Sequence, residues 1–274
     1  MKRTPKFLSG IKKVNDSFDK WPIPEHGIKE EPFFLFIITP PRSGSTALAQ
    51  ILNSAQETTF LNKRGEGQWL IPGLCEADRW NPEKEINWES VRAVWLNRFD
   101  SIIGLVQNIQ LVIEKSPPNL VRIDQIKEVF PNHSLLAFNR NPYANCASTL
   151  YRNHDPINKS ELERIQIITQ IAENWMQRSI FISKWINKWN ITNFTYENFC
   201  ENPEYSISKL YKNIPLLKTV NVNTKIKVKD YKIQGIANQN ERQISKLKPG
   251  EIDAISNVLI RNPDIVSFFG YGIR

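Results

Sequence analysis

The sequence has few of the residues from which disulfide-stabilised and metal-binding proteins are built. It contains three cysteines and three histidines, and Cys75, Cys146 and Cys200 lie far apart without a Cys-x-x-Cys pair. This spacing excludes a disulfide scaffold and a zinc-finger framework, and it is typical of a protein from a reducing compartment. The histidines are equally scattered, so we expect no metal site.

Long apolar runs are also absent. The longest, from Pro32 to Pro41, is too short to span a bilayer, and the basic start MKRTPKFLSGIKKVNDSFDK lacks the apolar stretch of a signal peptide. Hydrophobic residues make up 41% and charged residues 23%, which is ordinary globular composition. We therefore expect a soluble cytoplasmic protein whose residues 1–274 form one domain, beginning with a polar N-terminal arm over 1–31.

The net charge of +8 is concentrated near the C-terminus. Ten lysine or arginine residues lie within 205–250, against only Asp230 and Glu241. Such a segment suggests an anionic partner, which would be nucleic acid, phosphate or an acidic substrate. Alternatively, the lysines of TKIKVKDYK belong to a solvated strand edge, because they alternate with Ile226, Val228 and Ile233.

Apolar runs and amphipathic stretches alternate along most of the chain. Strands are predicted at residues 32–39, 58–62, 110–115, 134–140 and 191–196. Helices are predicted between and after them, beginning near Ala47, Asn87, Pro117, Asn141 and Ser160. This order predicts an α/β protein with a P-loop-type three-layer fold, in which helices flank a central parallel sheet of about five strands.

The first predicted strand runs directly into a glycine-containing turn and a helix. The candidate anion-binding residues there are Arg42, Ser43, Gly44, Ser45 and Thr46. The backbone N–H groups of the first helical turn and the helix dipole would face a bound oxyanion. A loop for nucleoside triphosphates would read GxxxxGK[ST], but Thr39 stands at its first glycine and Ser45 at its lysine. Because that lysine and Mg²⁺ serve the β- and γ-phosphates, the loop indicates a phosphate or sulfate group instead of Mg–ATP.

A second candidate anion site follows the fourth predicted strand, in NRNPYANCASTLYR. Arg140 leaves the tip of the strand, where open parallel sheets bind their ligands. Ser148 and Arg152 are four residues apart on the next helix and share one of its faces. The alternative is a surface helix with an unrelated serine and arginine. Together with the first loop, the arginines and the hydroxyl predict a ligand with two separated phosphate groups.

These motifs together resemble those of the sulfotransferases that use 3′-phosphoadenosine 5′-phosphosulfate (PAPS). The loop PPRSGSTAL looks like the family's 5′-phosphosulfate loop, and the spacing from Arg140 to Ser148 looks like its 3′-phosphate motif. TYENFCENP (195–203) is similar to the family's YED-L-ENP stretch, whose tyrosine lies beside the nucleotide. The resemblance therefore implies PAPS as the cofactor, 3′-phosphoadenosine 5′-phosphate (PAP) as its product, and Tyr196 in the cofactor site.

Within this family, the chain is more similar to tyrosylprotein sulfotransferases and related bacterial enzymes than to the cytosolic phenol and steroid enzymes. Arg152 has a counterpart in that branch, and EKSPPN matches a segment that implies Lys115 near the transferring sulfuryl group. KRGEGQWLIP is similar to a Gly-Glu-Glu-x-x-x-Ile-Pro segment that carries the catalytic base. ANQNERQISK resembles a C-terminal cofactor-covering segment, which implies Lys246 and Asn240 and a covering role for the basic segment 205–250.

The sequence departs from the family patterns at three places. Gly67 replaces the second glutamate, which leaves Glu66 as a base displaced by one residue and His154 as the next candidate. Ala47 stands where the cytosolic branch has a tryptophan that stacks on adenine, and that branch's Lys-Thr-His segment is absent. The Golgi members' N-terminal membrane anchor is absent too, which points to a bacterial or otherwise cytoplasmic enzyme.

The sequence thus predicts a sulfotransferase that moves the sulfuryl group of PAPS to a hydroxyl of a carbohydrate, a tyrosine or a small alcohol. The expected mechanism is a metal-independent in-line displacement, in which Arg42, Lys115 and loop N–H groups neutralise charge and Glu66 takes the hydroxyl proton. Two alternatives stay open. One is a P-loop kinase-like phosphotransferase, and the other is a non-catalytic module that binds polyanions or nucleic acid through the lysines of 205–250.

Overall fold

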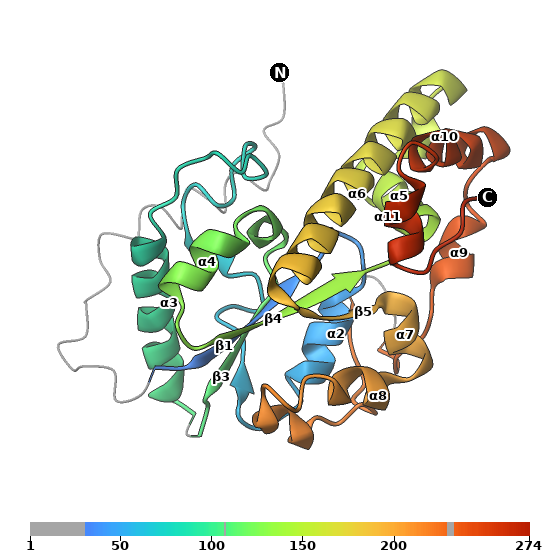
Figure 1. The fold of residues 1–274 in the computed structure, drawn as a ribbon. Helices are drawn as coiled ribbons and strands as arrows, with labels where there is room; N and C mark the ends of the chain where they lie inside the picture. Colours follow the sequence, from blue (N-terminus) through green and yellow to red (C-terminus); the bar gives the residue numbers. More distant parts are fainter. Residues whose placement is uncertain (1–30, 107, 229–232) are drawn as a thin grey trace.

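One parallel sheet of five strands forms the centre of the molecule (Figure 1). The computed structural model describes residues 31–106, 108–228 and 233–274, so the predicted arm lies outside the described residues except for Glu31. The strand order is β2-β3-β1-β4-β5. The strands are β1 (Phe33–Ile38), β2 (Thr58–Thr59), β3 (Leu111–Glu114), β4 (His133–Asn139) and β5 (Thr192–Thr195). All five predicted strands are present.

The second strand is much shorter than the sequence predicts. Its pairing with β3 covers only Thr58 and Thr59. The carbonyl of Leu61 accepts a hydrogen bond from Arg98 Nε (2.9 Å), a side chain of the helix α3 (Trp88–Ile103), and not from a neighbouring strand. The chain then turns at Asn62, whose side chain binds the Glu66 carbonyl (2.6 Å). The predicted strand therefore ends early and becomes the turn that carries Glu66.

Helices cover both faces of the sheet. The α-helices besides α3 are α2 (Ser45–Leu52), α4 (Ile123–Val129), α5 (Pro142–Asn153), α6 (Glu161–Trp189), α7 (Tyr196–Glu201), α8 (Pro203–Ser208), α9 (Asn240–Ile244), α10 (Pro249–Leu259) and α11 (Pro263–Phe268). The 3₁₀ helices are η2 (Gly67–Leu70), η3 (Pro117–Val121), η4 (Pro156–Asn158) and η5 (Pro215–Thr219).

The side chains of β1 show why the sheet lies in the middle layer. Phe34 and Phe36 point into a core with α3, α4 and the C-terminal half of α6, whereas Leu35 and Ile37 point into a core with α2, α7 and α8. All four are fully buried or nearly so, as expected for a parallel strand with helices on both faces. The three-layer α/β fold predicted from the sequence is therefore confirmed.

The helix α6 joins this sheet to a third core, formed with α5 and α10. Ser160 begins α6 with the predicted capping box, because its hydroxyl accepts from the Glu163 N–H while Glu163 binds the Ser160 N–H. One turn further, Arg164 forms an ion pair with Glu251 of α10 (2.6 Å), and both side chains are buried. In Figure 1 these C-terminal helices lie beside the long α6.

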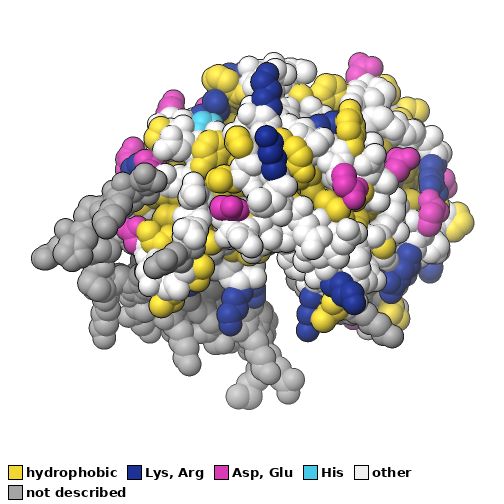
Figure 2. Space-filling model, turned by 90° about the horizontal axis from the view of Figure 1, so that it is seen from below, with side chains coloured by type: hydrophobic (Ala, Val, Ile, Leu, Met, Phe, Trp, Pro, Cys, Tyr) yellow, Lys and Arg dark blue, Asp and Glu magenta, His cyan; other side chains and the backbone are white. Residues whose placement is uncertain are grey.

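Among its described residues, the basic segment does not form the strand that its alternation suggests. A single antiparallel bridge links Ile226 to Gln234, and Ile233 is 62% exposed. Residues 229–232 lie outside the described residues. On the face drawn in Figure 2, lysine and arginine side chains lie in separate groups and do not form one continuous patch. Within the part of the chain that the structure describes, none of the helices combines the length and apolarity that a bilayer crossing needs.

Candidate active site

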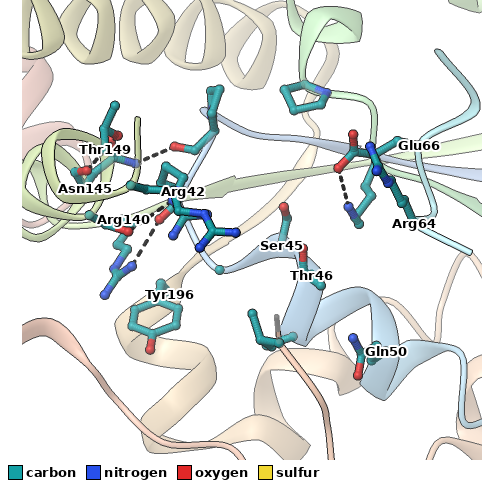
Figure 3. A pocket seen from close by; sticks show the side chains of 18 of the residues that line it. Arg42, Ser45, Thr46, Gln50, Arg64, Glu66, Arg140, Asn145, Thr149 and Tyr196 are labelled. Atoms are coloured by element: carbon teal, nitrogen blue, oxygen red, sulfur yellow. Dashed lines mark hydrogen bonds and ion pairs between the residues drawn. The ribbon is translucent and has the colours of Figure 1, made fainter. Parts of the chain in front are cut away.

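The carboxyl ends of the strands meet at one edge of the sheet, where they open into a cavity of about 1110 Å³. Because β1 lies between β3 and β4, the segments that follow these three strands are neighbours there. The predicted site residues that line the cavity are Arg42, Gly44, Ser45, Thr46, Glu66, Lys115, Arg140, Ser148, Arg152, His154 and Tyr196. In Figure 3, Ser45 and Thr46 lie between Arg140 and Tyr196 on one side and Glu66 on the other.

Two of the predicted cofactor residues do not line the cavity. Ser43 is fully buried in the loop, where its hydroxyl accepts a hydrogen bond from Asn145 Nδ2 (3.2 Å). Lys246 directs its ammonium to Gln243 Oε1 (3.4 Å) and to the ring of Tyr151. The structure therefore does not bring Lys246 together with the other cations of the site.

The loop after β1 has the backbone geometry of an anion cradle. Arg42 and Gly44 both have positive φ angles (68° and 92°), and α2 begins at Ser45 without a side-chain cap or an acidic residue in its first turn. The N–H groups of that turn and the positive end of the helix dipole are thus left for a ligand. Asn145 of α5 holds the loop through Nδ2, which also donates to the Pro41 carbonyl (2.8 Å). Asn145 was not predicted from the sequence, since only the packing of α5 against the loop reveals it.

Tyr196 closes one side of this loop. A Cβ atom at Gly44 would lie 2.5 Å from Cδ2 of the tyrosine, so only glycine permits the two to pack as they do. The guanidinium of Arg140 lies 4.3 Å from the centre of the same ring, within the range of a cation–π contact. The tyrosine hydroxyl donates to the Ala237 carbonyl (2.9 Å) and accepts from the Gln239 N–H (3.0 Å). Tyr196 therefore ties the C-terminal segment over the cavity.

Arg140 is held in place but is not fully paired. Its Nε donates to Asn240 Oδ1 (2.9 Å) and its Nη1 donates to the Arg42 carbonyl (3.0 Å). The nearby carboxylate of Glu197 binds the Asn240 amide instead (2.6 Å). Nη2 of Arg140 is buried without a hydrogen-bond partner among the residues that the structure describes. Arg42 Nε reaches the hydroxyl of Ser148 (3.2 Å). A buried charged donor without a partner is costly, so this group is poised for an anionic ligand.

On the other side of the loop, Lys115 and Glu66 form an ion pair (2.8 Å), with side chains only 3% and 21% exposed. The second oxygen of Glu66 accepts from Trp69 Nε1 (2.8 Å) and Gln68 Nε2 (3.0 Å). Burial alone would raise the pKa of Glu66. The charge of Lys115 and the three hydrogen bonds outweigh burial, and the pKa is lowered below its ordinary value of 4.5. Glu66 is therefore an ionised carboxylate in a fixed position.

A second, deeper carboxylate lies against the backbone of Gly67. Glu114, fully buried at the end of β3, accepts from the N–H groups of Gly67 (2.6 Å) and Ser116 (2.7 Å). Burial raises the pKa of Glu114 to about 7. A Cβ atom at Gly67 would lie 2.7 Å from both this carboxylate and the ring of Trp95. Position 67 has no room for a side chain, and Glu66 is the carboxylate of this turn that lines the cavity.

The cavity is strongly cationic. Its lysine and arginine residues are Arg42, Lys63, Arg64, Arg79, Lys115, Arg140, Arg152, Arg178 and Lys227. Glu66 is the only carboxylate among the described residues that line it. His154 also lines it, and burial, followed by the charge of Lys159, lowers the pKa of its imidazole. Among the described residues, no group of three or more histidine, cysteine, aspartate or glutamate side chains has the arrangement of a metal site. The electrostatics thus favour a ligand with several negative charges.

Comparison with known proteins agrees with this architecture. The sulfotransferase STF9 from Mycobacterium avium matches with a TM-score of 0.55 and 11% sequence identity, over 97% of this chain and 81% of that one. A sulfotransferase from Alicyclobacillus acidocaldarius matches with a TM-score of 0.53 and 11% sequence identity, over 89% of this chain and 97% of that one. A sulfotransferase domain from the curacin biosynthetic pathway matches with a TM-score of 0.51 and 16% sequence identity, over 90% of this chain and 100% of that one. At these identities the likeness concerns the fold alone.

The family follows from the sequence itself. A search of curated protein sequences finds no match. The model of the sulfotransferase family, however, matches residues 32–216, which run from β1 with its anion loop through the Arg140 cluster to η5. This range is well over half of the chain and contains Arg42, Glu66, Lys115, Arg140 and Tyr196. The chain therefore belongs to the sulfotransferase family.

Proposed function

We propose that this sulfotransferase uses PAPS as its donor and transfers the sulfuryl group to the hydroxyl of an acceptor. The observation that carries the proposal is the state of Arg140. Its Nη2 is buried without a partner among the described residues, while its Nη1 binds the Arg42 carbonyl in the loop that follows β1 and its guanidinium lies 4.3 Å from the centre of the Tyr196 ring. A donor with a 3′-phosphate and a 5′-phosphosulfate carries two separated anions, which suits two anion sites in one cavity.

The residues present fit this donor at both ends. The first turn of α2 and Arg42 would bind the 5′-phosphosulfate, and Arg140, Ser148 and Arg152 would bind the 3′-phosphate. Residues 226–228 and 234–239 line the same cavity in part, which supports a covering role for the segment 205–250. Of the basic residues in the described part of that segment, only Lys227 lines the cavity.

When bound, PAPS supplies the sulfuryl group and PAP is the leaving group. Arg42, Lys115 and the loop N–H groups would stabilise the negative charge that develops during the transfer. Glu66 takes the proton of the acceptor hydroxyl. Because Lys115 and Glu66 pair with each other in this structure, Lys115 must turn toward the transferred group to free Glu66 Oε1. Trp69 and Gln68 keep the other oxygen in place meanwhile.

The test is calorimetry with PAP and with adenosine 5′-phosphosulfate, which lacks the 3′-phosphate. The wild-type protein should bind both, and Arg140→Ala should weaken only PAP, by on the order of 1.5–3 kcal/mol for one lost charge-assisted contact. Arg261→Ala is the control, because Arg261 is an exposed arginine outside the cavity that pairs with Glu173. Failure of the wild type to bind PAP, or equal weakening of both ligands by Arg140→Ala, would contradict the proposal.

A further inference from the structure

The cavity extends past the proposed donor residues along one stripe of α6. The residues of this stripe that line it are Ile171, Asn174 and Arg178. Their spacing of three and four places them on one face of the helix. Trp175, on the neighbouring stripe, donates through Nε1 to the Arg140 carbonyl (3.1 Å). The helix is thus fixed to the end of β4, and Arg178 lies one turn further along in the same cavity.

Arg178 lies against a tryptophan and a second arginine. Its guanidinium lies 4.1 Å from the centre of the half-buried Trp80 ring. In the described part of the chain, Arg178 makes no hydrogen bond and no ion pair. The adjacent Arg79 also lines the cavity and donates only to the carbonyls of Cys75 (3.3 Å) and Glu76 (3.1 Å). Two cations therefore share this end of the cavity without a carboxylate.

The two carboxylates nearest to Arg79 in the sequence are already paired. Glu76 and Asp78 both bind the ammonium of Lys84, at 2.6 and 2.5 Å. Burial, followed by the positive charge of Arg79, lowers the pKa of Arg178 to about 10. The guanidinium still carries its charge at neutral pH, in surroundings that disfavour it. An anion placed between the two arginines would remove this cost.

We propose that Arg178 and Arg79, beside Trp80, form a subsite for an acidic group of the acceptor, so that the hydroxyl compound is itself an anion. This inference rests on the proposed function. Stacking on Trp80 fixes the plane of the Arg178 guanidinium and leaves its edge N–H groups for a carboxylate or sulfate. A neutral phenol or sugar would leave both cations uncompensated. The subsite therefore selects among the hydroxyl compounds that the transfer chemistry alone accepts.

The test compares acceptors that differ only in the acidic group. The pairs are 4-hydroxyphenylacetate with its amide, and methyl glucuronide with methyl glucoside, each titrated into PAP-saturated protein. Saturation with PAP keeps these probes out of the donor site. The variants are Arg178→Gln, which removes the charge, and Arg178→Lys, which keeps it. Lys184→Gln is the matched control, because Lys184 is an exposed cation of the same helix that does not line the cavity.

In at least one pair, the acidic member should bind the wild type about tenfold or more tightly than the neutral member, as for one charge-assisted contact. The preference should fall to within about twofold in Arg178→Gln and persist in Lys184→Gln. In Arg178→Lys it should shrink but exceed about twofold, because the charge stays and the planar fork is lost. No preference in either pair, or a preference that survives in Arg178→Gln, would overturn the subsite. Titration of PAP alone tests the donor separately. If PAP fails to bind, the proposed function is contradicted. The same acceptor pairs, titrated without PAP, then still test whether Arg178 binds the acidic group.

Discussion

At the scale of single residues, the cavity holds two candidates for the base, of which Glu66 forms an ion pair with Lys115. The lowered pKa of Glu66 makes it a weak base that is always ionised near neutral pH. His154 is the other candidate, and its lowered pKa leaves the imidazole neutral there. Both groups are therefore unprotonated at pH 7. A pH profile can distinguish the two, because the ordinary pKa is 4.5 for the Glu66 carboxyl and 6.5 for the His154 imidazole.

We expect Glu66→Gln to lower turnover by about 10²–10⁴-fold, the usual contribution of a positioned base, with little change in PAP affinity. The amide keeps the shape of the side chain but loses its basicity. The wild-type kcat/KM should stay constant as the pH falls through 6.5 and decline only below 4.5, since the pKa of Glu66 is lowered.

Turnover of Glu66→Gln within a few-fold of wild type would remove Glu66 from this role. An acid limb that begins just below pH 6.5 would point to His154 instead. In that case we expect turnover to fall in His154→Gln, which is assayed in parallel.

At the scale of elements, the start of α2 depends on the contact between Gly44 and Tyr196. We expect Gly44→Ala to destabilise the fold by at least roughly 1–2 kcal/mol, because its φ of 92° disfavours a side chain and the new Cβ would press on the ring. PAP affinity should fall as well, since the loop N–H groups move. Thermal unfolding and calorimetry measure the two effects.

Gly272→Ala is the control for this substitution, because no atom lies within 4 Å of a Cβ at Gly272 and its φ is not positive. Wild-type stability and PAP binding in Gly44→Ala would show that the loop accommodates a side chain and that the close packing is not required.

The same elements show what the sequence can predict. Strands and the anion loop were found because each is a local pattern: an apolar run, then a turn with glycine, then a helix. The roles of Asn145, Glu114 and Arg178 were not found, because each depends on how α5, β3 or α6 packs against a distant segment. The length of β2 was wrong for a related reason, since the Arg98 side chain of α3 takes the carbonyl of Leu61.

At the scale of the whole molecule, the buried pair of Arg164 and Glu251 joins the C-terminal helices to the rest. We expect Glu251→Ala to cost about 3–5 kcal/mol in the free energy of unfolding, because it leaves a buried guanidinium without its counter-ion. Glu173→Ala should cost at most about 1 kcal/mol, since its pair with Arg261 is exposed. Urea unfolding of both variants makes the comparison. Equal losses would mean that the α6–α10 contact does not depend on the charge pair.

The cationic cavity also predicts how the reaction responds to metal removal. A kinase-like reaction would need Mg²⁺ and the loop lysine, which is Ser45 here. The arginines and Lys115 that line the cavity can neutralise the transferred group themselves. We therefore expect sulfuryl transfer from PAPS to continue at an unchanged rate in excess EDTA. Activity that is lost in EDTA and restored by Mg²⁺ would favour the kinase-like alternative.

The strand order has a consequence for how this enzyme can change over evolutionary time. Lys115, Arg42 and Arg140 follow the three adjacent parallel strands β3, β1 and β4. The strands β3 and β4 are therefore two inter-strand spacings, or about 10 Å, apart. Arg79 and Trp80 come from the long loop between η2 and α3, which belongs to no strand. In the proposed assignment, the donor-binding residues follow strands of the sheet, whereas the acceptor subsite comes from a loop and one stripe of α6. We therefore expect substitutions in that loop to change the preferred acceptor and to leave the donor site unchanged.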